Sequence, residues 1–129
     1  MIVRKIKKIT TNETYLSFFQ NIKKYISVNR VFFVSAKKKC LRGNHAHKKC
    51  SQLLVSVSGN YYVEIFDGKK TKKVLLKELK NFIYVPPLHW VKVFFEKKNK
   101  LMVFCNQNFK QKDYINKISE FKKFLNKKR

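Results

Sequence analysis

The sequence predicts an all-β fold, a closed barrel or jelly roll, that ends in one short α-helix. Between about residues 15 and 105 of the 129-residue chain, short segments rich in aromatic and β-branched residues follow one another, as strands prefer. Turn-forming residues separate several of them. The apolar spacing becomes helical only near the end of the chain. Many short strands separated by turns are typical of barrels and jelly rolls.

Eight segments are expected to form strands, and several of them stop at clear turn signals. The run 60–66 leads into Asp67 and Gly68, a strong hairpin signal, from which 71–77 returns. The run 81–85 ends at two prolines, which cannot donate to a ladder. A lysine-rich loop is expected at 36–39. The expected strands are 15–19, 30–35, 52–58, 60–66, 71–77, 81–85, 89–95 and 101–105.

The last segment is expected to form a helix at about residues 112–126. Apolar side chains recur there at helical spacing, and Asp113 would cap the helix or lie in its first turn. A chain of this length builds one hydrophobic core, so residues 1–129 are expected to form a single domain. The apolar positions of the expected helix are Tyr114, Ile115, Ile118, Phe121, Phe124 and Leu125.

The chain is strongly basic, with a formal net charge of +24 from 31 Lys+Arg against 7 Asp+Glu. Such a charge first suggests a polyanionic partner. The cations are almost all lysines spread along the chain, whereas base and phosphate recognition favours arginine. Nucleic acid is therefore not the expected partner, although a basic binding module stays an alternative. The field is expected to steer an anionic substrate inward.

The sequence indicates a cytoplasmic protein without a membrane segment. No apolar run approaches the roughly 18 to 20 residues that a membrane span needs. The N-terminal residues alternate charged with apolar side chains and lack the apolar block of a secretion signal. Cys40, Cys50 and Cys105 form no C-x-x-C motif, and we expect them to be reduced structural thiols.

Two of the three histidines, His45 and His47, stand two residues apart ahead of the strand expected at 52–58. At positions i and i+2 of a strand, both side chains project from the same face. If that face looks into a small barrel, both rings enter one pocket, although two surface histidines would give the same pattern. Neutral imidazole takes and returns protons near pH 7, so the pair indicates acid/base chemistry.

A metal site is the alternative interpretation of the histidine pair. A stable catalytic metal site uses three or more protein ligands, commonly two histidines with a carboxylate or a third histidine. Gln52 stands where that carboxylate would be expected, and a neutral amide is a poor ligand. The third histidine, His89, could still converge on the pair. The ligand count favours a site without metal or other cofactor.

The spacing G-x-H-x-H-x4-Q-x6-G, from Gly43 to Gly59, resembles the first motif of the cupin superfamily of small β-barrels. A closer resemblance, to the bacterial sugar 3,4-ketoisomerases, covers most of the chain. It rests on the order and spacing of R-V-F-F-V, R-G-N-H-A-H-K, F-D-G, Y-V-P-P-L-H-W and D-Y-I. The resemblance implies a homodimeric cupin that acts on dTDP-4-keto-6-deoxyglucose. The product, a dTDP-3-keto-6-deoxyhexose, would supply a 3-amino sugar for surface polysaccharide.

Such an isomerase moves the ketone from C4 to C3 by removing the C3 proton, passing through an enediol and returning a proton at C4. We expect His47 to be the principal base and His45 its partner in proton transfer or positioning. Arg42 could hold the enediolate or pyrophosphate through its planar fork, unless it pairs with a loop carboxylate. The expected substrate-binding residues are Arg42, Gln52, Trp90, His89 and Arg30.

Structural roles remain open for two of these residues, because Trp90 could be core and Gln52 a satisfied buried amide. The chain also departs from the family pattern. Phe32 and Phe33 replace tyrosines, one of which is thought to share in the proton chemistry. Further departures are Glu13, where an arginine or tyrosine would reach the sugar, and Val91, where a histidine or arginine usually follows the tryptophan.

These departures leave the configuration at C4 open, and they keep two other functions under consideration. One is another cupin that acts on a 4-keto sugar nucleotide, such as a 3,5-epimerase, which should carry a His-Asp dyad and a catalytic tyrosine. The chain has aspartate only at Asp67 and Asp113. The other is a sugar-nucleotide-binding cupin without catalytic activity.

Overall fold

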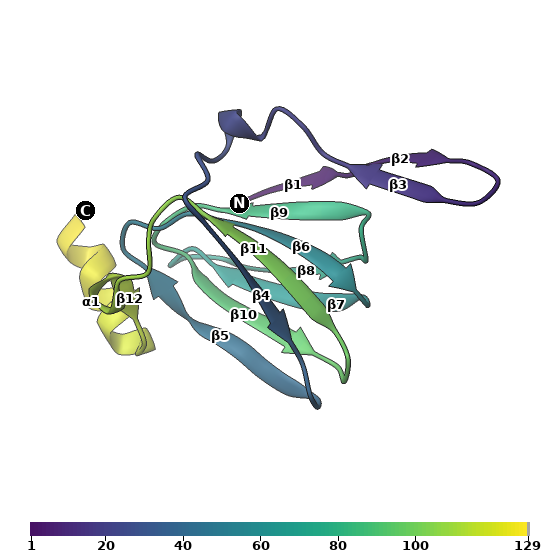
Figure 1. Ribbon diagram of the computed structural model, residues 1–129. Helices are drawn as coiled ribbons and strands as arrows, with labels where there is room; N and C mark the ends of the chain where they lie inside the picture. Colours follow the sequence, from purple (N-terminus) through teal and green to yellow (C-terminus); the bar gives the residue numbers. More distant parts are fainter. Residues whose placement is uncertain (129) are drawn as a thin grey trace.

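The computed structural model describes residues 1–128 and contains two five-stranded sheets, a two-stranded arm and one α-helix (Figure 1). The strands are β1 (Ile2–Lys5), β2 (Lys7–Thr10), β3 (Tyr15–Phe18), β4 (Arg30–Ser35), β5 (Cys40–His47), β6 (Gln52–Ser58), β7 (Tyr61–Phe66), β8 (Thr71–Leu76), β9 (Asn81–Val85), β10 (Trp90–Phe95), β11 (Lys100–Cys105) and β12 (Tyr114–Ile115). The helical elements are the 3₁₀ turns η1 (Ile22–Lys24) and η2 (Gln111–Asp113) and the helix α1 (Ile118–Lys128).

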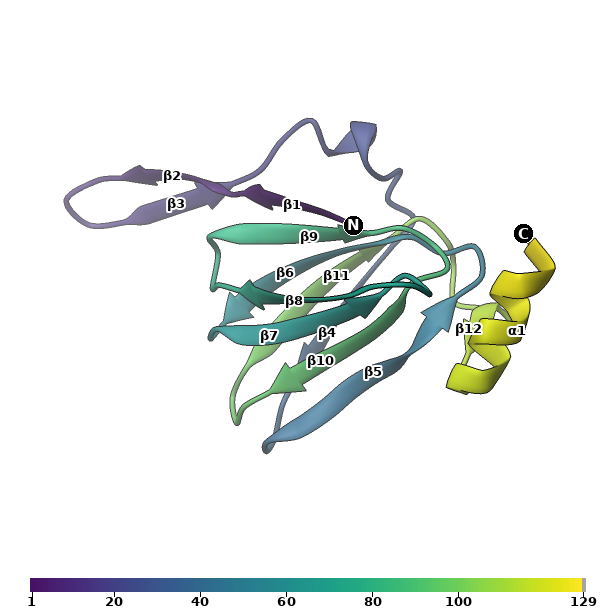
Figure 2. The same ribbon diagram turned by 180° about the vertical axis from the view of Figure 1, so that it is seen from behind.

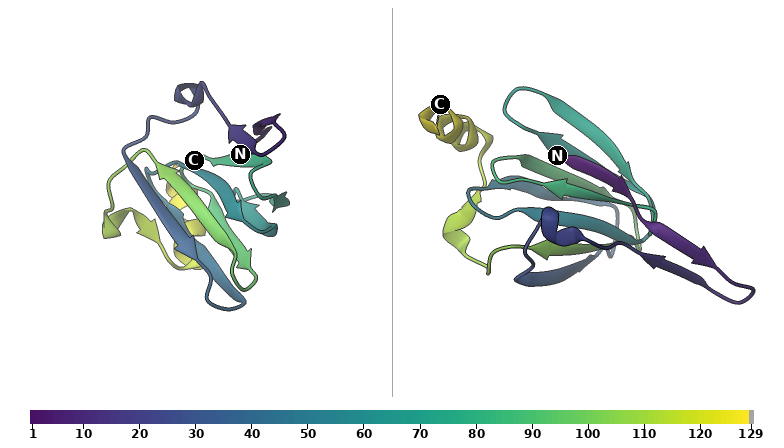
Figure 3. Two further views of the ribbon diagram at one scale, coloured as in Figure 1. Left: turned by 45° about the vertical axis from the view of Figure 1, so that its right-hand side comes forward. Right: turned by 90° about the horizontal axis from the view of Figure 1, so that it is seen from above.

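The two large sheets face each other as the layers of a jelly roll (Figures 2 and 3). One sheet has the strand order β1-β9-β6-β11-β4, and the other has the order β12-β5-β10-β7-β8. Neighbouring strands are antiparallel throughout both sheets. The predicted all-β jelly roll with a short C-terminal helix is therefore confirmed, and each of the eight expected strands is present within a residue or so.

The core lies between the sheets, because alternate residues of each strand point inward. Strand β7 shows this clearly, with Tyr61, Val63 and Ile65 buried and the residues between them more exposed. Burial of such a side chain stabilises the fold by about 1.5–3 kcal/mol. The corresponding buried residues of β10 and β11 are Val91, Val93, Phe95, Leu101, Val103 and Cys105.

A second apolar cluster covers the outer face of the sheet that contains β6. Leu53 and Val55 of β6 pack there against Ile26 and Phe19 of the segment that precedes β4. This cover is incomplete, because Phe33 on β4 is 65% exposed. Strands β2 and β3 pair only with each other and project from the barrel as an arm (Figure 1). Neither β1 nor β2 was expected from the sequence pattern.

The C-terminal helix begins at Ile118, so the expected start near residue 112 is wrong. Tyr114 and Ile115 instead form β12, which pairs with the open edge of β5. That edge satisfies the backbone groups of residues 114 and 115, which a helix would otherwise pair internally. Asp113 binds the loop after β5 rather than capping the helix. Within residues 1–128, no helix has both the length and the apolar character needed to cross a bilayer.

Candidate active site

Strand β5 carries both histidines and contains a bulge that sets their direction. Its register with β10 shifts between Val91 and Lys92, opposite Gly43 and Asn44. Both of these residues have left-handed φ angles, 77° and 58°. A Cβ atom on Gly43 would lie 2.9 Å from the carbonyl oxygen of Val91, so glycine suits the close approach. The bulge changes the alternation of β5.

As a result, Arg42 and His45 border the same cavity, although residues three apart on a regular strand face opposite ways. The interior cavity has a volume of about 170 Å³ and lies between the sheets. Its polar lining comes from Arg42, His45, Gln52 and Tyr114, and apolar side chains form most of the remaining wall. A wider open cavity of about 620 Å³ adjoins it and shares Arg42, Gly43, His45 and Tyr114.

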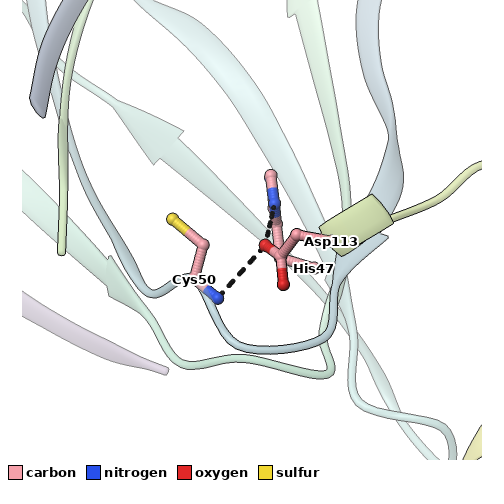
Figure 4. Close-up of side chains that lie close together, drawn as sticks. All are labelled: His47, Cys50 and Asp113. Carbon is pink, nitrogen blue, oxygen red and sulfur yellow. Dashed lines mark hydrogen bonds and ion pairs between the residues drawn. The ribbon is translucent and has the colours of Figure 1, made fainter. Parts of the chain in front are cut away.

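His47 lies behind His45 and is only 5% exposed. Its ring centroid is 5.0 Å from that of His45, at an interplanar angle of 88°. Nδ1 of His47 lies 3.0 Å from Oδ2 of Asp113 (Figure 4). Because a carboxylate only accepts, Nδ1 carries the hydrogen and Nε2 keeps its lone pair. Nε2 is buried and has no hydrogen-bond partner within the described chain.

His45 has the same tautomer, since its Nδ1 lies 3.0 Å from the carbonyl oxygen of Gly43 and must donate to it. Burial and the neighbouring His47 lower the pKa of His45 to about 4. Burial also lowers the pKa of His47, although the Asp113 carboxylate opposes this. Both imidazoles are therefore neutral near pH 7, each with a free Nε2 lone pair that is able to accept a proton.

Asp113 anchors the loop after β5 as well as His47. Its carboxylate accepts the backbone N–H of Lys49 at 2.7 Å and that of Cys50 at 3.3 Å. From the sequence, Asp113 was expected at a helix start, so this role was missed. The His47–Asp113 pair is also the kind of His-Asp dyad that was expected of a 3,5-epimerase, so the scarcity of aspartate does not separate the two activities. The signal that could have found it is chemical: Asp113 is one of only two aspartates in a very basic chain, and buried histidines often donate to a carboxylate.

Tyr114 is the second residue of the site that the sequence analysis missed. Strand β12 pairs Tyr114 with His47, and this register brings the phenol ring beside both imidazoles. Its centroid lies 4.9 Å from that of His45 and 4.4 Å from that of His47. Tyr114 lines both the interior cavity and the open cavity. Tyr114 was expected to be an apolar residue of a helix. Its side chain faces the site because Tyr114 instead belongs to strand β12.

Gln52 and Arg30 lie close to this group. Gln52 is 7% exposed, and its Nε2 donates to Sγ of Cys105 at 3.7 Å. The Arg30 guanidinium carbon lies 5.3 Å from the ring centroid of Phe32, a wall residue of the cavity. Nε and Nη2 of Arg30 are buried without a partner in the described chain. Burial alone would lower the pKa of Arg30, but the Cys105 thiol and the Tyr114 hydroxyl raise it overall.

Three of the five expected substrate-binding residues, Arg30, Trp90 and His89, do not line the interior cavity. Val91 and Val93 of β10 face it, so strand alternation turns Trp90 to the opposite face of the sheet. There Trp90 packs against Phe121 of α1, with ring centroids 5.7 Å apart. His89 borders a separate small cavity of about 70 Å³. The convergence of all three histidines, which the metal alternative had left open, is therefore not found.

The three departures from the family pattern also have definite places. Phe32 and Val91 both line the interior cavity, where neither offers a polar group. Phe33 lies on the outer face of its sheet and is largely exposed. Glu13 lies at the exposed turn between β2 and β3, at the tip of the arm (Figure 1). Of these four residues of a single chain, Phe32 and Val91 border the cavity beside His45, and Phe33 and Glu13 do not.

One group of side chains has the composition of a metal site. Ligand atoms of His47, Cys50 and Asp113 lie within 4.8 Å of one another (Figure 4). The imidazole and the carboxylate already bond each other, and the same carboxylate accepts two backbone N–H groups. A cation at this place would have to compete with all three bonds. The group is better described as a support that fixes His47.

A jelly-roll barrel with paired histidines on one strand, beside a cavity between its sheets, is typical of the cupin class. The family model FdtA, described as WxcM-like, C-terminal, matches residues 1–126. The chain therefore belongs to this family.

Similar proteins of known structure or activity agree with this assignment. A TDP-4-oxo-6-deoxy-α-D-glucose-3,4-oxoisomerase from Aneurinibacillus thermoaerophilus is 32% identical over 103 residues, which cover 78% of this chain and 74% of the relative. A 3,4-ketoisomerase from Helicobacter canadensis has a TM-score of 0.88 at 23% identity, over 97% of this chain and 96% of the other.

A mutant of the 3,4-ketoisomerase QdtA from Thermoanaerobacterium thermosaccharolyticum, in complex with TDP-4-keto-6-deoxyglucose, has a TM-score of 0.87 at 22% identity. This match covers 98% of the present chain and 94% of that chain. The two structural matches confirm the cupin-type fold, and the named relative is a TDP-sugar isomerase, as the sequence resemblance implied.

Proposed function

We propose that this protein is a sugar-nucleotide isomerase that moves the ketone of dTDP-4-keto-6-deoxyglucose from C4 to C3. One observation carries the proposal: His45 lines the interior cavity as a neutral imidazole whose Nδ1 is committed to a backbone carbonyl. Its free Nε2 is suited to accept the C3 proton, which the adjacent C4 carbonyl makes acidic. Family membership and the similar TDP-4-oxo-6-deoxyglucose isomerase support this substrate class.

We assign different tasks to the two histidines. His45 is the base that meets the sugar, because it lines the cavity, whereas His47 lies buried behind it. Asp113 holds His47, and the neutral His47 ring packs against the His45 ring and fixes its orientation. This assignment reverses the order expected from the sequence. Arg42 adds a cation at the junction of the two cavities, where it would stabilise the enediolate or the pyrophosphate.

The proposed reaction can be tested by incubating the purified protein with dTDP-4-keto-6-deoxyglucose in D2O and following the sugar by NMR. The expected result is a ketone at C3, with deuterium at C4, the carbon that carries the new hydroxyl, wherever the proton on the histidine exchanges with D2O before it is returned. The same spectrum would show whether that hydroxyl is galacto or gluco. An unchanged spectrum would refute the function. Prior treatment with EDTA is expected to leave the rate unchanged, and a loss of activity would show that a metal takes part.

We also propose that the protein is a cytoplasmic homodimer. Apolar side chains on the projecting arm and on the outer face of β4 are exposed, which favours burial against a second copy. Ile9, Leu16 and Phe33 are 51%, 56% and 65% exposed. Sedimentation should give twice the chain mass of 15.5 kDa. A monomer mass at micromolar concentration would contradict the dimer. Fractionation of the source cells tests the cytoplasmic location.

The depressed pKa of His45 predicts the pH dependence of the reaction. The base acts only when neutral, and burial beside His47 lowers its pKa from 6.5 to about 4. We therefore expect kcat/KM to stay level from neutral pH down to about pH 5 and to fall near pH 4. Rates measured on dTDP-4-keto-6-deoxyglucose across this range test the expectation, and an acid limb centred near 6.5 would contradict it.

Stability must be followed in the same experiment, because the same shift destabilises the fold in acid. Below pH 6.5 the unfolded chain protonates this histidine while the folded chain does not, so stability falls as the pH drops toward 4. Circular dichroism at each pH will separate the loss of fold from the loss of the base. Only rates from folded samples bear on the pKa of His45.

A further inference from the structure

The isomerisation moves a proton between oxygens as well as between carbons. When the C3–H bond breaks, its electron pair forms the C3=C4 bond and the C4 carbonyl pair moves to O4, which must gain a proton. In the second half O3 loses its proton, the C3 carbonyl forms, and C4 takes the proton back from imidazolium. The site therefore needs a group that first gives a proton to O4 and then accepts one from O3.

Neither histidine has a proton to give in the first half. In both neutral imidazoles the Nδ1 hydrogen is already donated, to the carbonyl of Gly43 in His45 and to Asp113 in His47. Each Nε2 offers only a lone pair. Arg42 and Gln52 also line the interior cavity, but a guanidinium stays protonated in proteins and a neutral amide does not release a proton near pH 7.

Tyr114 is the remaining proton donor in the wall. Among the described residues that line the interior and open cavities, it alone carries a hydroxyl group. A tyrosine side chain carries an O–H group that is able to donate a proton. On the strand β4 side of the cavity the wall residue is Phe32, which offers no such group.

The surroundings of Tyr114 also suit a transient phenolate. Arg42 lines the same two cavities, and Arg30 lies close enough for the Tyr114 hydroxyl to contribute to its raised pKa. Two nitrogens of Arg30 are buried without a partner in the described chain. A cation that is desolvated in this way stabilises a negative charge beside it more strongly than it would in water.

We propose that Tyr114 is a catalytic residue, which gives its hydroxyl proton to O4 as His45 takes the C3 proton. In the second half the phenolate accepts the O3 proton, the C3 carbonyl forms, and His45 returns its proton to C4. Both groups end in their starting states, so no other reactant is required. This inference rests on the proposed function and adds the second proton carrier that the reaction demands.

The test is Tyr114→Phe, which keeps the ring that packs beside both histidines and removes only the hydroxyl. We expect kcat on dTDP-4-keto-6-deoxyglucose to fall by about 10²–10⁴-fold, with KM within about threefold of wild type and an unchanged melting temperature. The wild type should also show a basic limb in its pH profile, where the phenol ionises, and Tyr114→Phe should lack it. The matched control is Tyr62→Phe, at a tyrosine of β7 that is 46% exposed and lies outside both cavities.

The outcomes separate this inference from the function on which it rests. An inactive wild type would overturn both. An active wild type with Tyr114→Phe within about threefold of its kcat would overturn only the role of Tyr114 and leave the isomerase intact. A slow variant that retains the basic limb, or that no longer binds dTDP, would assign Tyr114 a structural role and also overturn the proposal. Loss of kcat and of the basic limb together, with dTDP binding retained, supports it.

Discussion

Replacing His45 by asparagine is expected to lower kcat on dTDP-4-keto-6-deoxyglucose by about 10²–10⁴-fold, the usual loss when a general base is removed. Asparagine retains a donor for the Gly43 carbonyl but has no lone pair of suitable basicity at the Nε2 position. Binding of dTDP should change little, because His45 is assigned to the sugar and not to the nucleotide. Steady-state kinetics and calorimetric titration with dTDP measure the two quantities.

The other two histidines provide matched comparisons for this variant. His47→Asn should reduce kcat by less than His45→Asn, since His47 lies behind the cavity wall. His89→Asn should remain near wild type, because His89 borders a separate cavity. If His47→Asn proves the most damaging and His45→Asn retains substantial activity, the roles of the pair must be exchanged, as the sequence alone suggested.

Replacing Asp113 by asparagine should affect both activity and stability. Both oxygens of the carboxylate accept N–H groups, three in all. In asparagine one of these oxygens becomes an NH2 group, which then faces at least one N–H donor. The fold is expected to lose about 1–3 kcal/mol for the unsatisfied group. If His47 instead changes tautomer to accept from the amide, its Nε2 gains a hydrogen and loses its lone pair. We expect kcat to fall by about 10–100-fold, the range seen when the hydrogen-bond partner of a metal-bound histidine is replaced.

Urea unfolding and steady-state kinetics measure the two effects separately. The control is Asp67→Asn, because Asp67 also accepts two backbone N–H groups in a turn but uses a single oxygen and borders the separate cavity of His89. That variant should stay close to wild type in both measurements. If the two variants lose equal stability and Asp113→Asn keeps its activity, Asp113 only anchors the loop and has no role in catalysis.

The features that depend on neighbouring residues could be predicted from the sequence. The shared direction of His45 and His47 follows from strand spacing, and the hairpin at Asp67 and Gly68 from turn chemistry. The position of Trp90 could also have been predicted from strand alternation. Val91, Val93 and Phe95 are the apolar alternates of β10, so Trp90 belongs to the opposite face. The family resemblance had drawn Trp90 toward the substrate instead.

The features that depend on contacts between distant residues could not be predicted. Asp113 and Tyr114 stand ahead of an amphipathic helix and resemble its first turn, because their local sequence does not show that the edge of β5 is open. The bulge at Gly43 is likewise set by its close approach to β10, a strand that begins almost fifty residues later. Single-sequence patterns carry no signal for either contact.

The two-residue strand β12 makes the site less durable than the barrel that holds it. Asp113 and Tyr114 reach the histidines through a contact that closes a loop of 66 residues, and they are held there by β12, its neighbouring turns and the packing of Phe121 against Trp90. A short edge strand followed by a largely exposed helix belongs to the part of a fold that opens first. Local opening of this segment would release the phenol and the carboxylate together while both large sheets stay paired. The protein would then pass through a folded but inactive state before it unfolds.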